Sequence, residues 1–245
     1  MKLHRLTAVC AAAAGIALVA PQGAQAQSQT PALPVGWLSA SPGIVRAGTR
    51  PELKWSITHP ASVIDYVTVT NNTVTPKEEL DMEIRVLGAG VTSSNSNGTN
   101  FTFVPTEAAF SYDGGSYSRI FYGTNHDVVP SKIVKSGVVQ KGKPLRFGGR
   151  YFWSNKWSAM YTSTSGTMNV RTLVNGQTPP TTYPLHTAPT LENFIKPYLD
   201  AGGRVKIGPM DVIVFMELTH TDAQKSNQGY DLQDMVLLVT FRTRN

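Results

Sequence analysis

The feature that most constrains this chain is a series of short runs in which apolar and polar residues alternate, separated by glycine, proline, asparagine and serine. In one run Leu53, Trp55 and Ile57 alternate with polar side chains, which gives a strand with one apolar face and one wet face. Other β-type runs are 63–70, 81–86, 99–104, 117–122, 133–139, 145–153, 168–174, 204–207, 211–218 and 232–241. Many short strands with turns between them indicate a sandwich or a barrel, and we expect an all-β, antiparallel β-sandwich.

Helical spacing is found in one segment, residues 190–200, where apolar residues recur on one side. Pro197 keeps this helix short or kinked. The run 234–241 is almost continuously apolar, as in a central strand that is covered on both faces. We therefore expect the second half of the fold to be rich in β-strands and to contain one short helix.

The N-terminus has the pattern of a secretory signal peptide. Lys2 and Arg5 precede an apolar run, 6–20, and small residues ending at Ala26 place the cleavage site before Gln27. The apolar run is shorter than the roughly 20 residues that a membrane-spanning helix needs. Residues 1–26 are thus predicted to be a signal peptide, and the mature chain to be periplasmic or extracellular without a transmembrane segment.

Cysteine usage and charge exclude several classes of protein. The single cysteine, Cys10, lies in the predicted signal peptide, so the mature chain has no disulfide, no cysteine-bound metal and no cysteine nucleophile. The formal net charge of +6 falls by two when Lys2 and Arg5 are removed. This mild excess, in an exported protein, gives no reason to expect a nucleic-acid partner.

The chain divides by composition into a leader and two β-rich parts. Residues 27–36 are rich in proline, serine, threonine and glutamine and are predicted to be a flexible leader. Residues 37–125 are predicted to form the first β domain. Residues 126–245 are predicted to form either a second β-rich domain or a continuation of the same sandwich.

Part of the first domain is similar to a known family. The stretch 37–70 resembles the opening strands of immunoglobulin-like modules of bacterial exported proteins, on the residues Ser41, Pro42, Val45, Gly48, Leu53 and Trp55. The resemblance implies an immunoglobulin-like first half and a binding, spacing or adhesive role. It implies no particular functional residue.

A strongly basic stretch follows the midpoint of the chain. Between Asp127 and Glu192 there is no acidic residue, and the cations are Lys132, Lys135, Lys141, Lys143, Arg146, Arg150, Lys156 and Arg171. Aromatic residues are concentrated within it, at 147–161. On an extended chain Tyr151, Trp153, Trp157 and Tyr161 would share one face.

Aromatic rings beside cations can stack on sugar rings and pair with anionic groups. We therefore predict a surface that contacts an anionic glycan of the cell surface or the extracellular space. Its residues are Arg150, Tyr151, Trp153, Lys156, Trp157 and Tyr161. In the alternative interpretation the aromatics fill the core, and the cations lie on a solvated face where they prevent the pairing of strand edges.

Acidic residues cluster near the C-terminus, around the polar loop 223–229. Carboxylates that converge at such a loop can bind calcium, so calcium is the one cofactor that the sequence suggests, with Asp222, Asp231 and Asp234 as ligands. The alternative is that Asp231 and Asp234 fix a turn. A transition-metal site with Glu217 and His220 is not expected, because residues three apart point to opposite faces of a regular strand.

Motifs of catalysis are missing from the sequence. There is no Gly-x-Ser-x-Gly elbow, no His-Glu-x-x-His and no phosphate-binding glycine loop, so no catalytic residue is predicted. We interpret the chain as a secreted or cell-surface binding or structural protein. Two alternatives remain: a self-assembling subunit of a surface layer or fibre that associates through edge strands, and a hydrolase whose catalytic groups only the fold brings together.

Overall fold

The computed structural model describes residues 35–41, 48, 50, 52–58, 61–94, 101–180, 193–227 and 229–244. The predicted signal peptide and most of the predicted leader lie outside the described residues. The described part is nearly all β, and each pair of its named strands is antiparallel. The prediction of an all-β, antiparallel fold is therefore confirmed.

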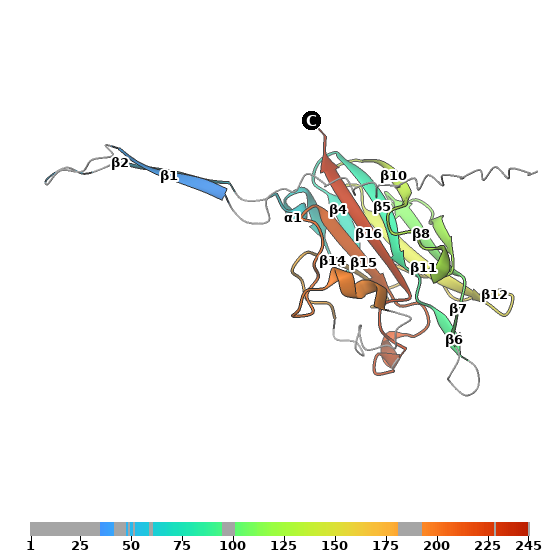
Figure 1. The fold of residues 1–245 in the computed structure, drawn as a ribbon. Helices are drawn as coiled ribbons and strands as arrows, with labels where there is room; N and C mark the ends of the chain where they lie inside the picture. Colours follow the sequence, from blue (N-terminus) through green and yellow to red (C-terminus); the bar gives the residue numbers. More distant parts are fainter. Residues whose placement is uncertain are drawn as a thin grey trace, which may run out of the picture. The chain divides into compact units, whose positions relative to one another are not determined.

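One sheet has five strands, with β16 in the middle (Figure 1). Its strand order is β10 (Ile133–Val139), β5 (Leu80–Gly88), β16 (Met235–Thr243), β15 (Asp211–Met216) and β14 (Val170–Val174). The first of these strands, β10, and the last, β14, form its edges.

The other large sheet has seven strands. Its main order is β3 (Val67–Val69), β4 (Thr73–Pro76), β11 (Leu145–Trp153), β8 (Thr106–Tyr112) and β9 (Ser118–Gly123). Two short strands, β12 (Lys156–Trp157) and β13 (Tyr161–Thr162), also pair with β11. The long strand β11 is thus the centre of this sheet.

Two hairpins pair outside these sheets. The first consists of β1 (Val35–Ser41) and β2 (Glu52–Thr58), and the second of β6 (Thr92–Ser94) and β7 (Phe101–Phe103). Because β1 begins at Val35, the end of the predicted leader is a strand. Both large sheets contain strands from before and after residue 126, as where β5 lies between β10 and β16.

One hydrophobic core takes side chains from both large sheets. Ile84 and Leu237 of the five-stranded sheet belong to it together with Leu145, Phe110 and Phe147 of the seven-stranded sheet. The rings of Phe110 and Phe147 have centroids 5.9 Å apart, and these residues face each other across β8 and β11. Burial of these apolar faces is the main stabilising contribution in a chain whose described part contains no cysteine.

A smaller cluster covers the other face of the five-stranded sheet. It includes Ile213 and Phe215 of β15 and Val236 of β16, packed with Val205 and Leu232. Both strands are therefore buried on both faces, which confirms the expectation of a central strand from the apolar run 234–241. The continuous apolar sequence reflects two separate cores that share one sheet.

The predicted strand 63–70 is wrong in its first half. Val63–Tyr66 form the helix α1, and only Val67–Val69 are strand. The Asp65 carboxylate accepts a hydrogen bond from the Ser62 backbone N–H at 3.0 Å, and the Val63 N–H donates to the Pro209 carbonyl at 2.7 Å. These contacts at the helix start override the strand preference of the β-branched residues.

The remaining helical elements are short 3₁₀-helices. They are η1 (Asn125–Asp127), η2 (Asn193–Tyr198) and η3 (Asp222–Gln224). The predicted helix near Pro197 is η2, which is 3₁₀ rather than α-helical. The predicted strand 204–207 is reduced to an isolated bridge between Leu199 and Val205. Within the described ranges, no helix is both long and apolar enough to span a bilayer.

We expect Phe147→Ala to lower the free energy of unfolding by about 3–5 kcal/mol, because it leaves a cavity in the shared core. Val129→Ala is the control, since Val129 is 52% exposed; its effect should be about 0.5 kcal/mol or less. Urea denaturation of both variants measures the difference. Similar losses for the two would show that the core does not join the sheets as described.

Candidate functional site

Three adjacent strands place a row of polar and aromatic residues on the face of the seven-stranded sheet that points away from the core. Tyr122 of β9 lies opposite Glu107 of β8, and Glu107 lies opposite Arg150 of β11. Their neighbours Ala108 and Tyr151 pack in or against the core. Because side chains alternate along a strand, the row points to the other side, which we call the outer face.

A tight hairpin adds a fourth residue to this row. Ser154 and Asn155 have φ values of 49° and 60°, as in the two-residue turn that suits the twist of a β-hairpin. The turn brings Trp157 of β12 opposite Phe152 of β11, and the two ring centroids are 5.1 Å apart. Phe152 is two residues from Arg150, so Trp157 also lies on the outer face.

Glu107 is a carboxylate held between two arginines. Its side chain is only 5% exposed; one of its oxygens lies 2.6 Å from Nη2 of Arg119, and the other lies 3.2 Å from Nη2 of Arg150. The Arg150 guanidinium lies 4.3 Å from the centroid of a Trp157 ring, and that of Arg119 lies 5.0 Å from the Tyr122 ring centroid. We call Glu107, Arg119, Tyr122, Arg150 and Trp157 the arginine–aromatic cluster.

This cluster is open to solvent although its carboxylate is not. The side chains of Arg119 and Arg150 are 50% and 31% exposed, and Tyr122 is 46% exposed. One carboxylate neutralises only one of the two guanidinium groups, so the surface keeps a positive charge. Ring contacts and ion pairs hold both guanidinium groups in fixed positions, which suits the recognition of an anion beside an apolar surface.

The structure divides the six residues predicted as the contact surface. Arg150 and Trp157 belong to the arginine–aromatic cluster. Tyr151 and Tyr161 are half-buried and pack against the core. The remaining two, Trp153 and Lys156, are exposed and lie opposite each other at the end of the hairpin.

The expectation that Tyr151, Trp153, Trp157 and Tyr161 share one face is wrong. It assumed one continuous extended chain, whereas the chain reverses at Ser154. Residues directly opposite in an antiparallel pair share a face, so Trp157 lies with Phe152, and Trp153 lies on the other face with Lys156.

Three members of the cluster were not predicted: Glu107, Arg119 and Tyr122. They lie on β8 and β9, outside the basic stretch that drew attention in the sequence. Their positions could have been predicted by pairing the two strands of the hairpin that turns at Gly114 and Gly115. A bulge, however, shifts the register of this pair between Ala108 and Ala109. Strict alternation cannot be followed through a bulge, because one residue is added to only one strand.

A second group of functional interest is the buried acidic centre, which we define as Glu217, Asp231 and Asp234. The carboxylate oxygens of these residues lie within 4.8 Å of one another. Two predicted calcium ligands, Asp231 and Asp234, are thus brought together, and the side chain of Asp222 lies outside the described residues. Glu217, the third member, was not among the predicted calcium ligands.

The assumption that Glu217 and His220 point to opposite faces is wrong. β15 ends at Met216, so the alternation of a strand no longer applies. Oε1 of Glu217 accepts hydrogen bonds from the N–H groups of Thr219 and His220, both at 3.0 Å, and lies 3.5 Å from Nδ1 of His220. The chain therefore folds back around this carboxylate.

Backbone N–H groups already occupy the oxygens of the acidic centre. Oε2 of Glu217 accepts from the Asp231 N–H at 3.1 Å, and Oδ2 of Asp234 accepts from the N–H groups of Leu218 at 2.6 Å and Thr219 at 3.0 Å. Calcium requires six to eight oxygen ligands, so it would compete with these donors. The contacts give the centre a structural role in the 217–234 loop, and calcium binding stays a prediction.

Burial raises the pKa of Asp234 well above its usual range, and the neighbouring charges of Glu217 and Asp231 raise it further. The neutral form is favoured because a buried charge next to like charges is costly. A protonated Asp234 also provides a hydrogen-bond donor for Glu217. Asp127, at η1, shows the opposite effect: hydrogen bonds from the backbone and side chain of Thr124 lower its pKa.

Comparisons with known proteins give no relative for this chain. No protein-family model matches it, no curated protein matches it, and no solved structure matches it. Function must therefore be argued from the two groups described above.

We expect Asp234→Asn to make stability less sensitive to pH. The pKa of Asp234 is higher in the folded state than in the unfolded state, where it is about 3.9. The protonated carboxyl therefore contributes its full stabilisation below about pH 3.9, and this contribution is lost as the pH rises through the pKa of the folded state. Asparagine keeps the acceptor and the donor without the charge, so the variant should gain stability relative to the parent as pH rises. The denaturation midpoint in urea, measured from pH 4 to pH 9, tests this.

Asp127→Asn is the matched control, because the pKa of Asp127 is lowered whereas that of Asp234 is raised. A lowered pKa gives stability that is present above the unfolded pKa and lost as pH falls through the folded pKa. This variant should therefore be less stable than the parent at neutral pH, and the difference should shrink in acid. If both variants changed the midpoint in the same direction with pH, the assignment of a raised pKa to Asp234 would be wrong.

Proposed function

We propose that this protein is an exported binding protein that holds an anionic polysaccharide on the arginine–aromatic cluster. The observation that carries the proposal is the pair of guanidinium groups around one shared carboxylate, with Arg119 over the exposed Tyr122 ring and Arg150 over the half-buried Trp157 ring. Sugar rings present C–H faces that stack on aromatics, and acidic sugars add carboxylates for the guanidinium groups.

The cluster is organised before any ligand arrives. Glu107 fixes both arginines, and the rings of Tyr122 and Trp157 support them from the side. A ligand therefore needs to order fewer flexible side chains, which lowers the entropic cost of binding. Trp153 and Lys156 are also exposed, at the end of the same hairpin, but they lie on its opposite face.

We further propose that the two large sheets form a β-sandwich with an immunoglobulin-like first half, and that residues 1–26 direct export to the periplasm or beyond. Support for the sandwich comes from the single core that takes side chains from both sheets. Support for export is the pattern of basic, apolar and small residues before Gln27. An exterior location would expose the cluster to cell-surface or extracellular glycans.

We expect the protein to bind polygalacturonate and to bind its fully methyl-esterified form much more weakly. Arg150→Gln should weaken the binding of polygalacturonate about tenfold, because it removes a charge-assisted hydrogen bond. Added salt should weaken binding by the parent, since ion pairs near a surface are screened. Isothermal titration calorimetry with the mature protein measures each of these effects.

Arg242→Gln is the matched control, since it removes the same charge from the five-stranded sheet, where the 56% exposed Arg242 pairs with Glu83. It should change the affinity less than twofold. Equal affinity of the parent for the charged and esterified polymers, or equal losses in the two arginine variants, would contradict the proposal.

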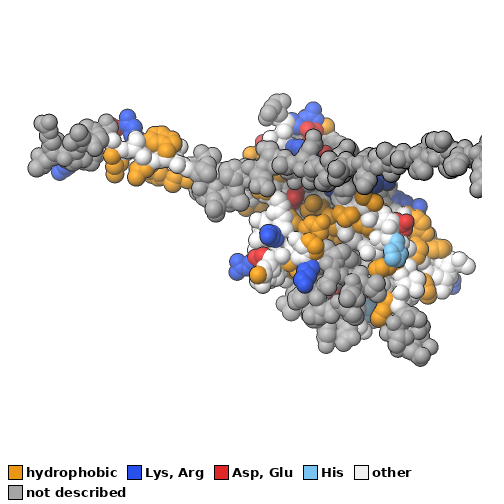
Figure 2. Space-filling model, viewed as in Figure 1, with side chains coloured by type: hydrophobic (Ala, Val, Ile, Leu, Met, Phe, Trp, Pro, Cys, Tyr) orange, Lys and Arg blue, Asp and Glu red, His pale blue; other side chains and the backbone are white. Residues whose placement is uncertain are grey.

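A second candidate function is self-assembly through the β1–β2 hairpin. Its register places Leu38, Leu53, Trp55 and Ile57 on one face, and these side chains are 52–70% exposed. Figure 2 shows hydrophobic side chains gathered along this hairpin. A two-stranded ribbon with one apolar face is marginally stable alone, and packing against the same face of a second copy would bury it.

We expect this association to depend on one face of the hairpin. Trp55→Ser should shift the mature protein toward the monomer in sedimentation velocity experiments, because it removes the largest ring from the apolar face. Trp37→Ser is the matched control: Trp37 is 57% exposed but lies opposite Ser56 on the polar face. A parent protein that stays monomeric at high concentration would exclude assembly of this kind.

A further inference from the structure

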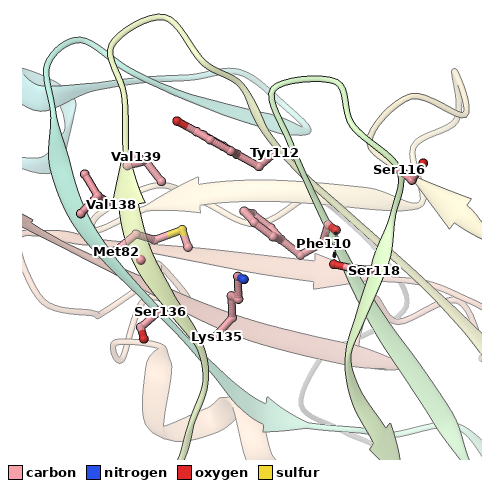
Figure 3. A pocket seen from close by; sticks show the side chains of 10 residues that line it. Met82, Phe110, Tyr112, Ser116, Ser118, Lys135, Ser136, Val138 and Val139 are labelled. Carbon is pink, nitrogen blue, oxygen red and sulfur yellow. Dashed lines mark hydrogen bonds between the residues drawn. The ribbon is translucent and has the colours of Figure 1, made fainter.

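A groove opens where the edges of the two large sheets meet. It lies between β10, an edge of the five-stranded sheet, and β9, an edge of the seven-stranded sheet, and its volume is about 280 Å³. Figure 3 shows Lys135 and Met82 on one side and Phe110, Tyr112 and Ser118 on the other, around the same space. This size is near the lower end of small-molecule sites, roughly 300–1,000 Å³.

Lys135 points into this groove because of its register. It lies opposite Ile84 of β5, a core residue, and opposite residues of an antiparallel pair share a face. At an interior strand this position would be buried, but β10 is an edge, so the ammonium group stays exposed. Within the described part of the chain, Lys135 makes no ion pair or side-chain hydrogen bond.

The lining favours a small polar anion with an apolar side. The floor is apolar, with Met82, Phe110 and Val139 buried at its base, and no acidic residue lines the groove. Ser116 and Ser136 also line the groove, but their side chains are directed away from the space between Lys135 and Phe110 (Figure 3). A cation beside an apolar floor matches the carboxylate and the C–H face of one acidic sugar ring.

The groove and the arginine–aromatic cluster lie on opposite faces of one edge strand, β9. On β9, Ser118 lies opposite Phe110 and faces the groove, whereas the next residue, Arg119, faces the outer side and binds Glu107. The edge of β9 therefore separates two cationic sites by the thickness of a single strand. A chain of sugars that lies over this edge would meet both sites.

We propose that the groove is a second subsite for the acidic polysaccharide, in which Lys135 binds the carboxylate of one sugar residue beyond those held by the arginine–aromatic cluster. This rests on the proposed function. A β-strand from a second copy is a poorer occupant, because β10 has a register shift between Ile133 and Lys135 and an inward-pointing cation. Both features discourage the addition of another strand.

The test compares galacturonate oligomers of increasing length by isothermal titration calorimetry. A dimer should bind through the arginine–aromatic cluster alone, and longer oligomers should also reach Lys135. We expect Lys135→Gln to leave the dimer unaffected and to weaken long oligomers about three- to tenfold, whereas Arg150→Gln weakens both. Lys135→Arg, which keeps the charge, should restore the affinity for long oligomers. Lys141→Gln, on an exposed turn, controls for the loss of a charge.

The outcomes separate the two proposals. If Lys135→Gln behaves like Lys141→Gln at every length while Arg150→Gln weakens binding, the groove is not a subsite and the proposed function stands. If Arg150→Gln has no effect and Lys135→Gln weakens every oligomer, the arginine–aromatic cluster does not bind the polymer. Both the proposed function and the proposal of a second subsite then fail. Concentration-dependent dimers of the parent that shield Lys135 from acetylation would assign the groove to a second copy and overturn the subsite.

Discussion

The antiparallel pairing of β8 with β11 is the contact on which the rest of the protein depends. One register sets Phe110 against Phe147 in the core and Glu107 against Arg150 on the outer face. Because side chains alternate, a slip of β8 by one residue would bury Glu107, expose Phe110 and break both pairs. Core packing therefore selects the register, and the register in turn assembles the arginine–aromatic cluster.

The protein stabilises its buried carboxylates in two different ways. Glu107 is buried, and its loss of hydration is offset by two guanidinium groups that themselves remain partly in water. In the acidic centre, Glu217 instead receives backbone N–H groups, and Asp234 reduces the repulsion through its raised pKa. The first arrangement leaves cations facing solvent, whereas the second turns inward and fixes a loop, which is why we propose binding at the first.

Sequence patterns predicted elements better than they predicted the site. The strands 133–139 and 145–153 were placed at their observed bounds, since Gly142 and Pro144 mark the turn between them. The turn at Ser154 and Asn155 was missed because it contains neither glycine nor proline, and that single reversal moves Trp157 to the face opposite Trp153. Glu107 and Arg150 are distant in sequence, and their contact depends on a register that no local pattern encodes.

The two interpretations of the basic stretch are compatible in this fold. Lys135 points inward from an edge strand, where a cation discourages pairing with another strand and also faces a groove without acidic residues. A single exposed ion pair contributes about 1 kcal/mol or less, so no one of these cations can hold a small anion tightly. Affinity must come from several weak contacts made at once, which favours a polymer with repeated charges over a single small molecule.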